Sequence, residues 1–361
     1  MKLIFHNYKF SWLEFLLLLC SILLLGWAIT SQIKDTGWSI WFETNRLDHI
    51  GSFMGGLFAI ISIFYLIKNL SEQNQITTIQ SFERNFLEIV KFCRDQVKEA
   101  KMPDPNSSDG LTSQLSGREV FSLFYSQIED AIKEIQKFLE DKSIKDLFIS
   151  EQEFKRQQQL WGDRLTDRTI AAIAYIITYI GVRKQGYELL IHKYLTPYNT
   201  NNIEHLMSVF RQKLAEYAPG SLKNASCNRL TKTEILNCKD KVYHGFQDVI
   251  GNYFRLLYQA VVFVDNQSIL SYKEKYKYVK MLRGQMSNME EIILFYNSLC
   301  DLGLAWEYNV IDNKSPELIT KYNLIKNIPS NFTKISFDKF YPNINYEYLI
   351  EEPPHRKKYE T

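Results

Sequence analysis

Glycine and proline are scarce in this sequence, at 15 and 9 of 361 residues. Sandwiches and barrels need many turns built from these residues, so their scarcity favours a helical protein. The five cysteines are scattered, and Cys227 and Cys238 have no paired histidine or cysteine at the spacing of a metal site. We therefore expect reduced thiols in a cytosolic domain and no bound metal.

An excess of charge of either sign is also absent, because 43 basic residues stand against 41 acidic ones. This balance gives no case for a nucleic-acid partner. The sequence contains no Gly-x-x-x-x-Gly-Lys-Ser/Thr loop, no Gly-x-Ser-x-Gly elbow and no His-Glu-x-x-His helix. We therefore predict no catalytic, cofactor-binding or metal-binding residues and a protein that is not an enzyme.

Two long apolar segments are present, at residues 10–30 and 50–67. At 1.5 Å per residue, helices of these lengths match a bilayer core of roughly 30 Å. A signal peptide is the alternative for the first segment, but Trp27 and the polar residues after it do not resemble a cleavage site. Basic residues before the first segment and after the second predict a transmembrane hairpin with both termini in the cytoplasm.

Small residues form one face of the second segment, where Gly51, Gly55 and Gly56 lie close together in the sequence. Such faces allow two helix backbones to approach closely. This face can pack against the first segment near Gly26, or against another copy of the chain in a homo-oligomer. Both alternatives predict helix packing in the lipid bilayer.

The second apolar segment continues without a proline or a helix-ending glycine into residues 68–101. Apolar residues recur there at steps of three and four, which places them on one helical face. They are Leu66, Leu70, Ile76, Ile79, Phe82, Phe86, Ile89, Cys93 and Val97. The pattern predicts one long helix that leaves the membrane.

The remaining chain indicates an all-α cytoplasmic domain over residues 102–328. Composition predicts a loop at 102–117 and a polar insertion at 218–241, while apolar periodicity predicts helices between them and beyond. The expected helices cover residues 119–148, 151–195 (one or two helices), 203–217, 243–264, 272–286, 291–300 and 316–328. Residues 170–182 are apolar on all sides, which fits a buried core helix better than a third span. Residues 329–361 are expected to form an irregular aromatic tail with a basic end.

A sharp corner between two helices is predicted at Met286 and Ser287. Ser287 and Glu290 have the spacing of a capping box, in which each side chain bonds the backbone amide of the other residue. The helix that begins there could end at Gly303.

Four stretches of the sequence carry a resemblance: residues 81–86 (SFERNF), 253–255 (YFR), 276–290 (YKYVKMLRGQMSNME) and 294–297 (LFYN). Together with the two apolar segments, they are similar to the phage abortive infection protein family, also called AbiC-like. The resemblance covers the hairpin, the exit helix and about residues 240–300. It implies an antiphage protein of the bacterial inner membrane that stops growth or kills the infected cell, without implying a particular chemistry.

The resemblance singles out a set of motif positions. They are Phe82, Phe86, Tyr253, Phe254, Arg255, Tyr276, Arg283, Gln285, Ser287, Glu290, Tyr296 and Asn297. Arg283, Gln285 and Tyr296 are expected either to form a buried polar network that fixes the helix corner or to bind a ligand or phage trigger.

Three functions are compatible with these features. In the first, a cytoplasmic helical sensor, triggered by a phage protein or a partner subunit, controls spans that perturb the membrane. In the second, the chain is a membrane-anchored enzyme such as a nuclease, or a signalling module. In the third, it is a structural membrane protein without a role in defence.

Overall fold

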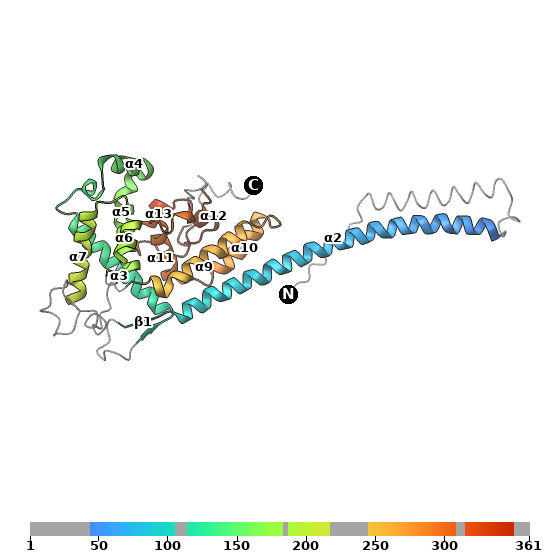
Figure 1. Cartoon of the computed structure of the whole chain (residues 1–361), viewed down its shortest axis with the longest axis horizontal. Coiled ribbons are helices and arrows are strands. Elements are labelled where there is room, and N and C mark those ends of the chain that lie inside the picture. The colour runs from blue at the N-terminus through green and yellow to red at the C-terminus, as the bar shows by residue number, and fades with distance from the viewer. Residues whose placement is uncertain (1–43, 105–113, 183–186, 217–244, 308–314, 350–361) are drawn as a thin grey trace. The chain divides into compact units, whose positions relative to one another are not determined.

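The computed structural model describes residues 44–104, 114–182, 187–216, 245–307 and 315–349. Contacts divide the chain into two compact units, residues 1–82 and residues 83–361. The predicted first span with Gly26, the predicted insertion at 218–241 and the basic end of the chain lie outside the described residues. The described chain is mostly helical, as predicted, and contains two short strands (Figure 1).

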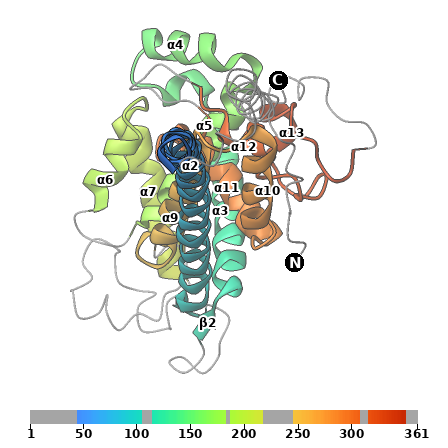
Figure 2. The same ribbon diagram turned by 90° about the vertical axis from the view of Figure 1, so that its right-hand side faces the viewer.

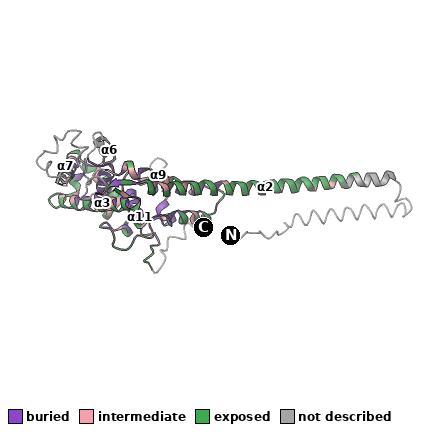
Figure 3. Ribbon diagram, turned by 90° about the horizontal axis from the view of Figure 1, so that it is seen from below, coloured by how far each residue is buried: buried purple, intermediate pink, exposed green. Residues whose placement is uncertain are grey.

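All described residues of the first unit belong to helix α2 (Thr44–Glu99), whose last turns belong to the second unit. The helix continues past Ile67 without a break, as the absence of proline and helix-ending glycine predicts. Large apolar residues in its membrane-length part are exposed, with Phe58 at 59% and Phe64 at 63%. Figure 3 shows most of α2 in green, the colour of exposed residues. Among the described residues, one helix, over Gly55–Glu99, is long and apolar enough to cross a membrane. The two-span hairpin and its orientation stay predictions.

The second unit begins with the end of α2 and a small antiparallel hairpin. Strand β1 (Lys101–Pro103) pairs with β2 (Gln114–Ser116), with Met102 opposite Leu115. The prediction of a loop over 102–117 is therefore wrong at both ends. The polar and proline-rich composition hides the pairing, because each strand is only three residues long.

Three helices form the centre of the second unit: α3 (Arg118–Phe138), α5 (Leu165–Ile180) and α11 (Asn288–Ser298). Residues that periodicity assigns to the core of α3 are buried: Val120, Phe121, Phe124, Ile128, Ile132 and Ile135. In α5, every residue from Arg168 to Ile180 is buried, which confirms the expected core helix, although it ends two residues before residue 182. Alanines in α5 let neighbouring helices approach closely, so this helix can be covered on all sides.

Further helices surround this centre (Figures 1 and 2). They are the 3-10 helix η2 (Ile144–Leu147), α4 (Glu151–Trp161), η3 (Gly162–Arg164), α6 (Tyr187–Tyr194), α7 (Thr200–Glu216), α9 (Gln247–Asp265), α10 (Tyr272–Arg283), η5 (Leu304–Trp306), α12 (Leu318–Tyr322) and α13 (Phe337–Phe340). Serine side chains cap α4 at Ser150 and α10 at Ser271, where Glu274 completes a capping box.

Several predicted helices are wrong in extent. The helix expected at 119–148 ends at Phe138 and is followed by the separate η2, because Ser143 and Asp146 form a new capping box. The helix expected from residue 243 begins at Gln247, because Gly245 has a φ of +97° and packs so closely on Ile180 that a side chain would overlap the Ile180 carbonyl.

The end of the chain also differs from the predictions. Helix α11 ends at Ser298, before Gly303, and the helix expected at 316–328 is reduced to α12 because Asn323 takes a left-handed conformation with a φ of +51°. The tail expected to be irregular contains α13. Aromatic rings of the tail pack around Phe295 of α11, with ring centroids 6.1 Å away for Phe337 and 6.2 Å for Tyr341.

Candidate functional site

The corner between α10 and α11 is built by the predicted capping box. The Glu290 amide donates to Ser287 Oγ at 3.4 Å, and the Ser287 amide donates to Glu290 Oε2 at 3.3 Å. These bonds satisfy amides that the first turn of a helix leaves without partners. The capping box starts α11 at Asn288 and turns the Glu290 side chain inward, where it is only 1% exposed.

Glu290 has a second role beyond capping, because two distant residues meet its carboxylate. The Tyr253 hydroxyl of α9 donates to Glu290 Oε2 at 2.8 Å, and Arg118 Nε at the start of α3 lies 3.5 Å from Oε1. Burial raises the pKa of Glu290, while the Tyr253 hydroxyl, the capping bonds and Arg118 act against that rise. Burial, with the adjoining carboxylate, also raises the pKa of Tyr253 well above its usual range. A buried carboxylate thus joins three helices.

Arg118 also fixes the corner itself. Its Nη2 donates to the backbone carbonyl of Gln285 at 2.8 Å, although the two residues are 167 positions apart. The Gln285 side chain is exposed, so the expectation that this side chain belongs to a buried network is wrong. Its backbone carbonyl makes the contact at the corner instead. Arg118 was missed by the sequence analysis because it lies at the edge of a polar loop, outside any apolar pattern.

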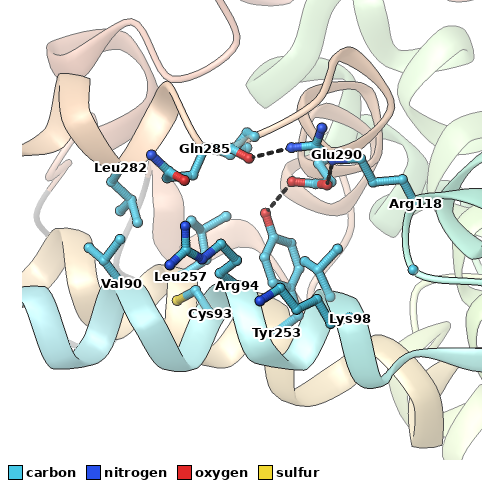
Figure 4. A pocket seen from close by; sticks show the side chains of 13 residues that line it. Val90, Cys93, Arg94, Lys98, Arg118, Tyr253, Leu257, Leu282, Gln285 and Glu290 are labelled. Carbon is cyan, nitrogen blue, oxygen red and sulfur yellow. Dashed lines mark hydrogen bonds and ion pairs between the residues drawn. The ribbon is translucent and has the colours of Figure 1, made fainter.

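A cavity of about 260 Å³ opens beside these residues, wholly within the second unit (Figure 4). Its wall combines the end of α2, the start of α3, α9 and the α10–α11 corner. It is lined by Val90, Cys93, Arg94, Val97, Lys98, Gly117, Arg118, Tyr253, Leu257, Leu282, Gln285, Met286 and Glu290. Figure 4 shows Arg94 and Lys98 on the α2 side, with Glu290 and Arg118 across the cavity. The cavity therefore has an apolar lining, basic side chains and a buried carboxylate.

A second polar network lies on the other side of the corner. Buried Arg283 donates through Nη1 to the carbonyls of Tyr322 at 3.3 Å and Asn323 at 2.9 Å. The Asn323 amide group donates to the Tyr276 hydroxyl at 3.1 Å. Arg283 and Tyr276, both motif positions, thus hold the turn after α12. Arg283 is buried and hydrogen-bonded, but neither the Gln285 side chain nor Tyr296 belongs to its network.

Glu291 extends this second network. Its two carboxylate oxygens accept the Asn327 backbone amide at 2.8 Å and the Asn327 side-chain amide at 2.9 Å. Its side chain is fully buried, and this burial raises its pKa to about 8 despite the bonds from Asn327 and the nearby Arg283 charge. In the sequence, Glu291 resembles an ordinary first-turn glutamate. In the structure, it is a buried carboxylate that binds Asn327.

Tyr296 and Asn297 reach a different part of the core and do not line the cavity. The Tyr296 hydroxyl donates to Glu129 Oε1 at 2.5 Å, and Asn297 Nδ2 donates to the Tyr175 hydroxyl at 2.9 Å. Tyr296 thus belongs to a partly buried polar pair with α3, apart from the Arg283 network. The motif residues support the same fold without meeting at one site.

The remaining motif residues divide between core and surface. Phe86 is buried with its ring edge-on to Tyr278, Phe254 is buried beside Phe121, and Phe82 is buried. Arg255 is exposed. In the first unit, no atom of the described residues outside the neighbouring turns of α2 comes within 4 Å of a Cβ added at Gly55 or Gly56, and Gly51 lies in the same helix.

Within the part of the chain that the structure describes, no group of His, Cys, Asp and Glu side chains could hold a metal ion. The described free cysteines, Cys93 and Cys300, are buried, and burial raises the pKa of each thiol to about 12. Such thiols are poor nucleophiles at neutral pH.

Comparison with protein families matches part of the chain. Residues 245–333 match the family described as "Putative phage abortive infection protein". The matched segment runs from the start of α9 past α12, so it includes Tyr253, Arg283 and Glu290 and extends beyond the expected limit near residue 300. The match associates the chain with phage defence. Comparisons with curated proteins and with solved structures found no match.

Proposed function

We propose that this chain is a bacterial phage-defence protein of the abortive infection type, which acts on a membrane under the control of its helical second unit. The observation that carries the proposal is the match of residues 245–333 to the abortive infection family. That segment contributes Tyr253, Gln285 and Glu290 to the cavity wall. The family resemblance and the candidate site therefore rest on the same helices.

The apolar part of α2 supports a membrane-acting mechanism. Phe58, Ile63, Phe64 and Leu66 are each more than half exposed, and lipid is the solvent that suits such a surface. Gly55 and Gly56 leave open space that another helix can fill. In the proposed mechanism, infection changes the second unit, and the apolar helices then assemble and make the bilayer leaky. The partners are the lipid, further copies of the chain and a phage protein or partner subunit as trigger.

A phage challenge with simultaneous measurement of membrane potential tests this function. Cells that carry the wild-type chain should lose potential during infection and release few phage. The double variant Gly51→Leu/Gly55→Leu should lose protection while the protein is still produced, because leucines block close helix packing. Cell death with an unchanged potential would exclude the membrane-acting mechanism.

A matched control uses the opposite face of the same helix. Ile60 and Phe64 lie about half a turn around the helix from Gly51. The double variant Ile60→Leu/Phe64→Leu keeps an apolar surface and leaves the glycines in place, so protection should persist. Loss of protection in both double variants would show that the glycine face has no special role.

A membrane-anchored binding or enzymatic module is the second candidate function. The cavity favours it, because every lining residue lies in the second unit. Expression of residues from about 70 onward distinguishes the two functions. Full protection without the apolar helix would support the module, whereas loss of protection with a folded fragment would support the membrane-acting protein.

A further inference from the structure

We infer that the cavity between the end of α2, α3, α9 and the α10–α11 corner binds a small organic anion, with one phosphate or carboxylate group on a mainly apolar body. The inference stands apart from the proposed function, because its test measures binding and requires neither phage nor membrane leakage.

The charge of the lining favours an anion. Arg94, Lys98 and Arg118 contribute positive charge to the cavity wall, and Glu290 is the acidic residue of that wall. Arg118 already lies against Glu290 and Lys98 Nζ lies 3.7 Å from Asp95 Oδ1, whereas Arg94 has no hydrogen bond or ion pair with any described residue. Arg94 is therefore available to a ligand, and its planar guanidinium can hold two oxygens of a phosphate or carboxylate.

The apolar part of the lining requires more than a simple ion. Apolar side chains contribute much of the wall, namely Val90, Val97, Leu257, Leu282 and Met286. An inorganic phosphate would leave this surface in contact with water, whereas an organic body would cover it. The volume of about 260 Å³ lies just below the usual range for drug-sized ligands, so the body is small, such as one ring or a short chain.

The buried carboxylate adds a specific polar contact. Glu290 Oε1 has less than 1 Å² of exposed surface and accepts no hydrogen bond from any described residue, although Arg118 lies 3.5 Å away. Buried acceptors normally have a donor partner. A ligand with an N–H or O–H group on its body can supply that donor while its anionic group contacts Arg94.

Calorimetric titration of the full chain in lipid nanodiscs tests the site with phenyl phosphate as the probe. Phenyl phosphate should bind at least tenfold more tightly than inorganic phosphate, which lacks the apolar body, and than benzyl alcohol, which lacks the charge. The probe 4-aminophenyl phosphate, which adds a donor for Glu290, should bind more tightly still. Absence of phenyl phosphate binding to the wild-type chain would overturn the inference.

Two variants of the same helix separate a specific site from general attraction. Arg94→Ala should weaken phenyl phosphate binding roughly tenfold or more, the usual effect of losing a charge-assisted hydrogen bond. Lys91→Ala removes the same charge less than one turn away at an exposed residue outside the lining, so it should bind as the wild type does. Equal weakening in both variants would contradict a defined site.

A cavity-filling variant provides an independent check. Val97→Phe places a ring in the cavity and should abolish binding, while an unchanged melting temperature shows that the chain remains folded. Unimpaired binding by this variant would place the ligand elsewhere and overturn the inference.

The same titration identifies the source of the anion. Hexyl phosphate, which carries a short apolar chain, represents soluble phosphate esters, and dihexanoyl phosphatidic acid represents lipid headgroups. Binding of either that depends on Arg94 supports the site and assigns its source. Failure of both, together with failure of phenyl phosphate, overturns the inference.

Discussion

The Tyr253 hydroxyl donates a 2.8 Å hydrogen bond to Glu290 Oε2 and so joins the middle of α9 to the first turn of α11. Both residues are almost fully buried. The bond therefore forms where an unpaired polar group would be most costly. It connects two stretches that the family resemblance marks separately in the sequence.

Replacement of Tyr253 by Phe tests the contribution of this bond. The variant Tyr253→Phe should lower the free energy of unfolding by about 1.5–3 kcal/mol, because it removes a donor to a buried carboxylate. Tyr258→Phe on the same helix is the matched control, since the Tyr258 hydroxyl makes no hydrogen bond with a described residue and its ring packs on Trp306. Urea unfolding of both variants checks the prediction, and equal losses would contradict it.

Glu291 should make the protein less stable as pH rises. Its pKa is about 8 in the folded protein, above the usual value of 4.5, so the folded state binds this proton more tightly than the unfolded state. The stabilisation is complete below about pH 4.5 and is lost as pH rises to about 8. Glu291→Gln keeps the group neutral, so the variant should gain stability relative to the wild type across this interval.

Urea unfolding at pH 5, 6.5 and 8.5 measures this effect. The difference in unfolding free energy between Glu291→Gln and the wild type should rise with pH by several kcal/mol, since each pKa unit is worth about 1.4 kcal/mol. The control is Glu140→Gln, at an exposed position after α3. Its unfolding free energy should differ from that of the wild type by the same amount at each pH. If the unfolding free energies of Glu291→Gln and the wild type change in parallel with pH, a raised pKa of Glu291 would be excluded.

Removal of Arg283 should loosen the turn after α12. Arg283→Ala leaves the Tyr322 and Asn323 carbonyls without their buried donor, at a cost of about 1–3 kcal/mol for each unsatisfied group. Hydrogen exchange should become faster over residues 318–328 before it changes in α5. Lys280→Ala, an exposed residue of the same helix, should leave exchange unchanged. Unaltered exchange in both variants would show that the turn does not depend on Arg283.

Gly303 should tolerate no side chain. A Cβ at this position would overlap the Asn297 carbonyl oxygen, so Gly303→Ala should destabilise the protein by about 3 kcal/mol. Gly284→Ala is the control, because Gly284 has a right-handed helical conformation and the nearest heavy atom to an added Cβ lies 3.4 Å away. It should change the stability by less than about 1 kcal/mol. Thermal unfolding that ranks the two variants in the opposite order would contradict this difference.

The corner and the core were predictable because their signals are local. Ser287 and Glu290 are three positions apart, and the apolar spacing in α3 reports one helical face directly. The cavity was not predictable, because Arg118 and Glu290 meet only through the packing of distant helices. The burial of Glu291 is invisible for the same reason, since a glutamate in the first turn of a helix is ordinarily a solvated residue.

Helix lengths were the least predictable feature. The helix after residue 118 is interrupted by a capping box at Ser143, and α12 is stopped by the left-handed Asn323. Each helix ends near a single polar residue, although the apolar spacing continues beyond it. The apolar spacing therefore predicts a longer helix than the structure contains. Composition likewise concealed α13, which is only four residues long.

The packing of aromatic rings on Phe295 has a practical consequence for fragments of this protein. The family match ends at residue 333, but Phe337 and Tyr341, which cover Phe295, come after that point. A fragment trimmed at residue 333 would uncover a fully buried ring of α11 and should aggregate on expression. The matched region is thus shorter than the set of residues that covers the core of α11.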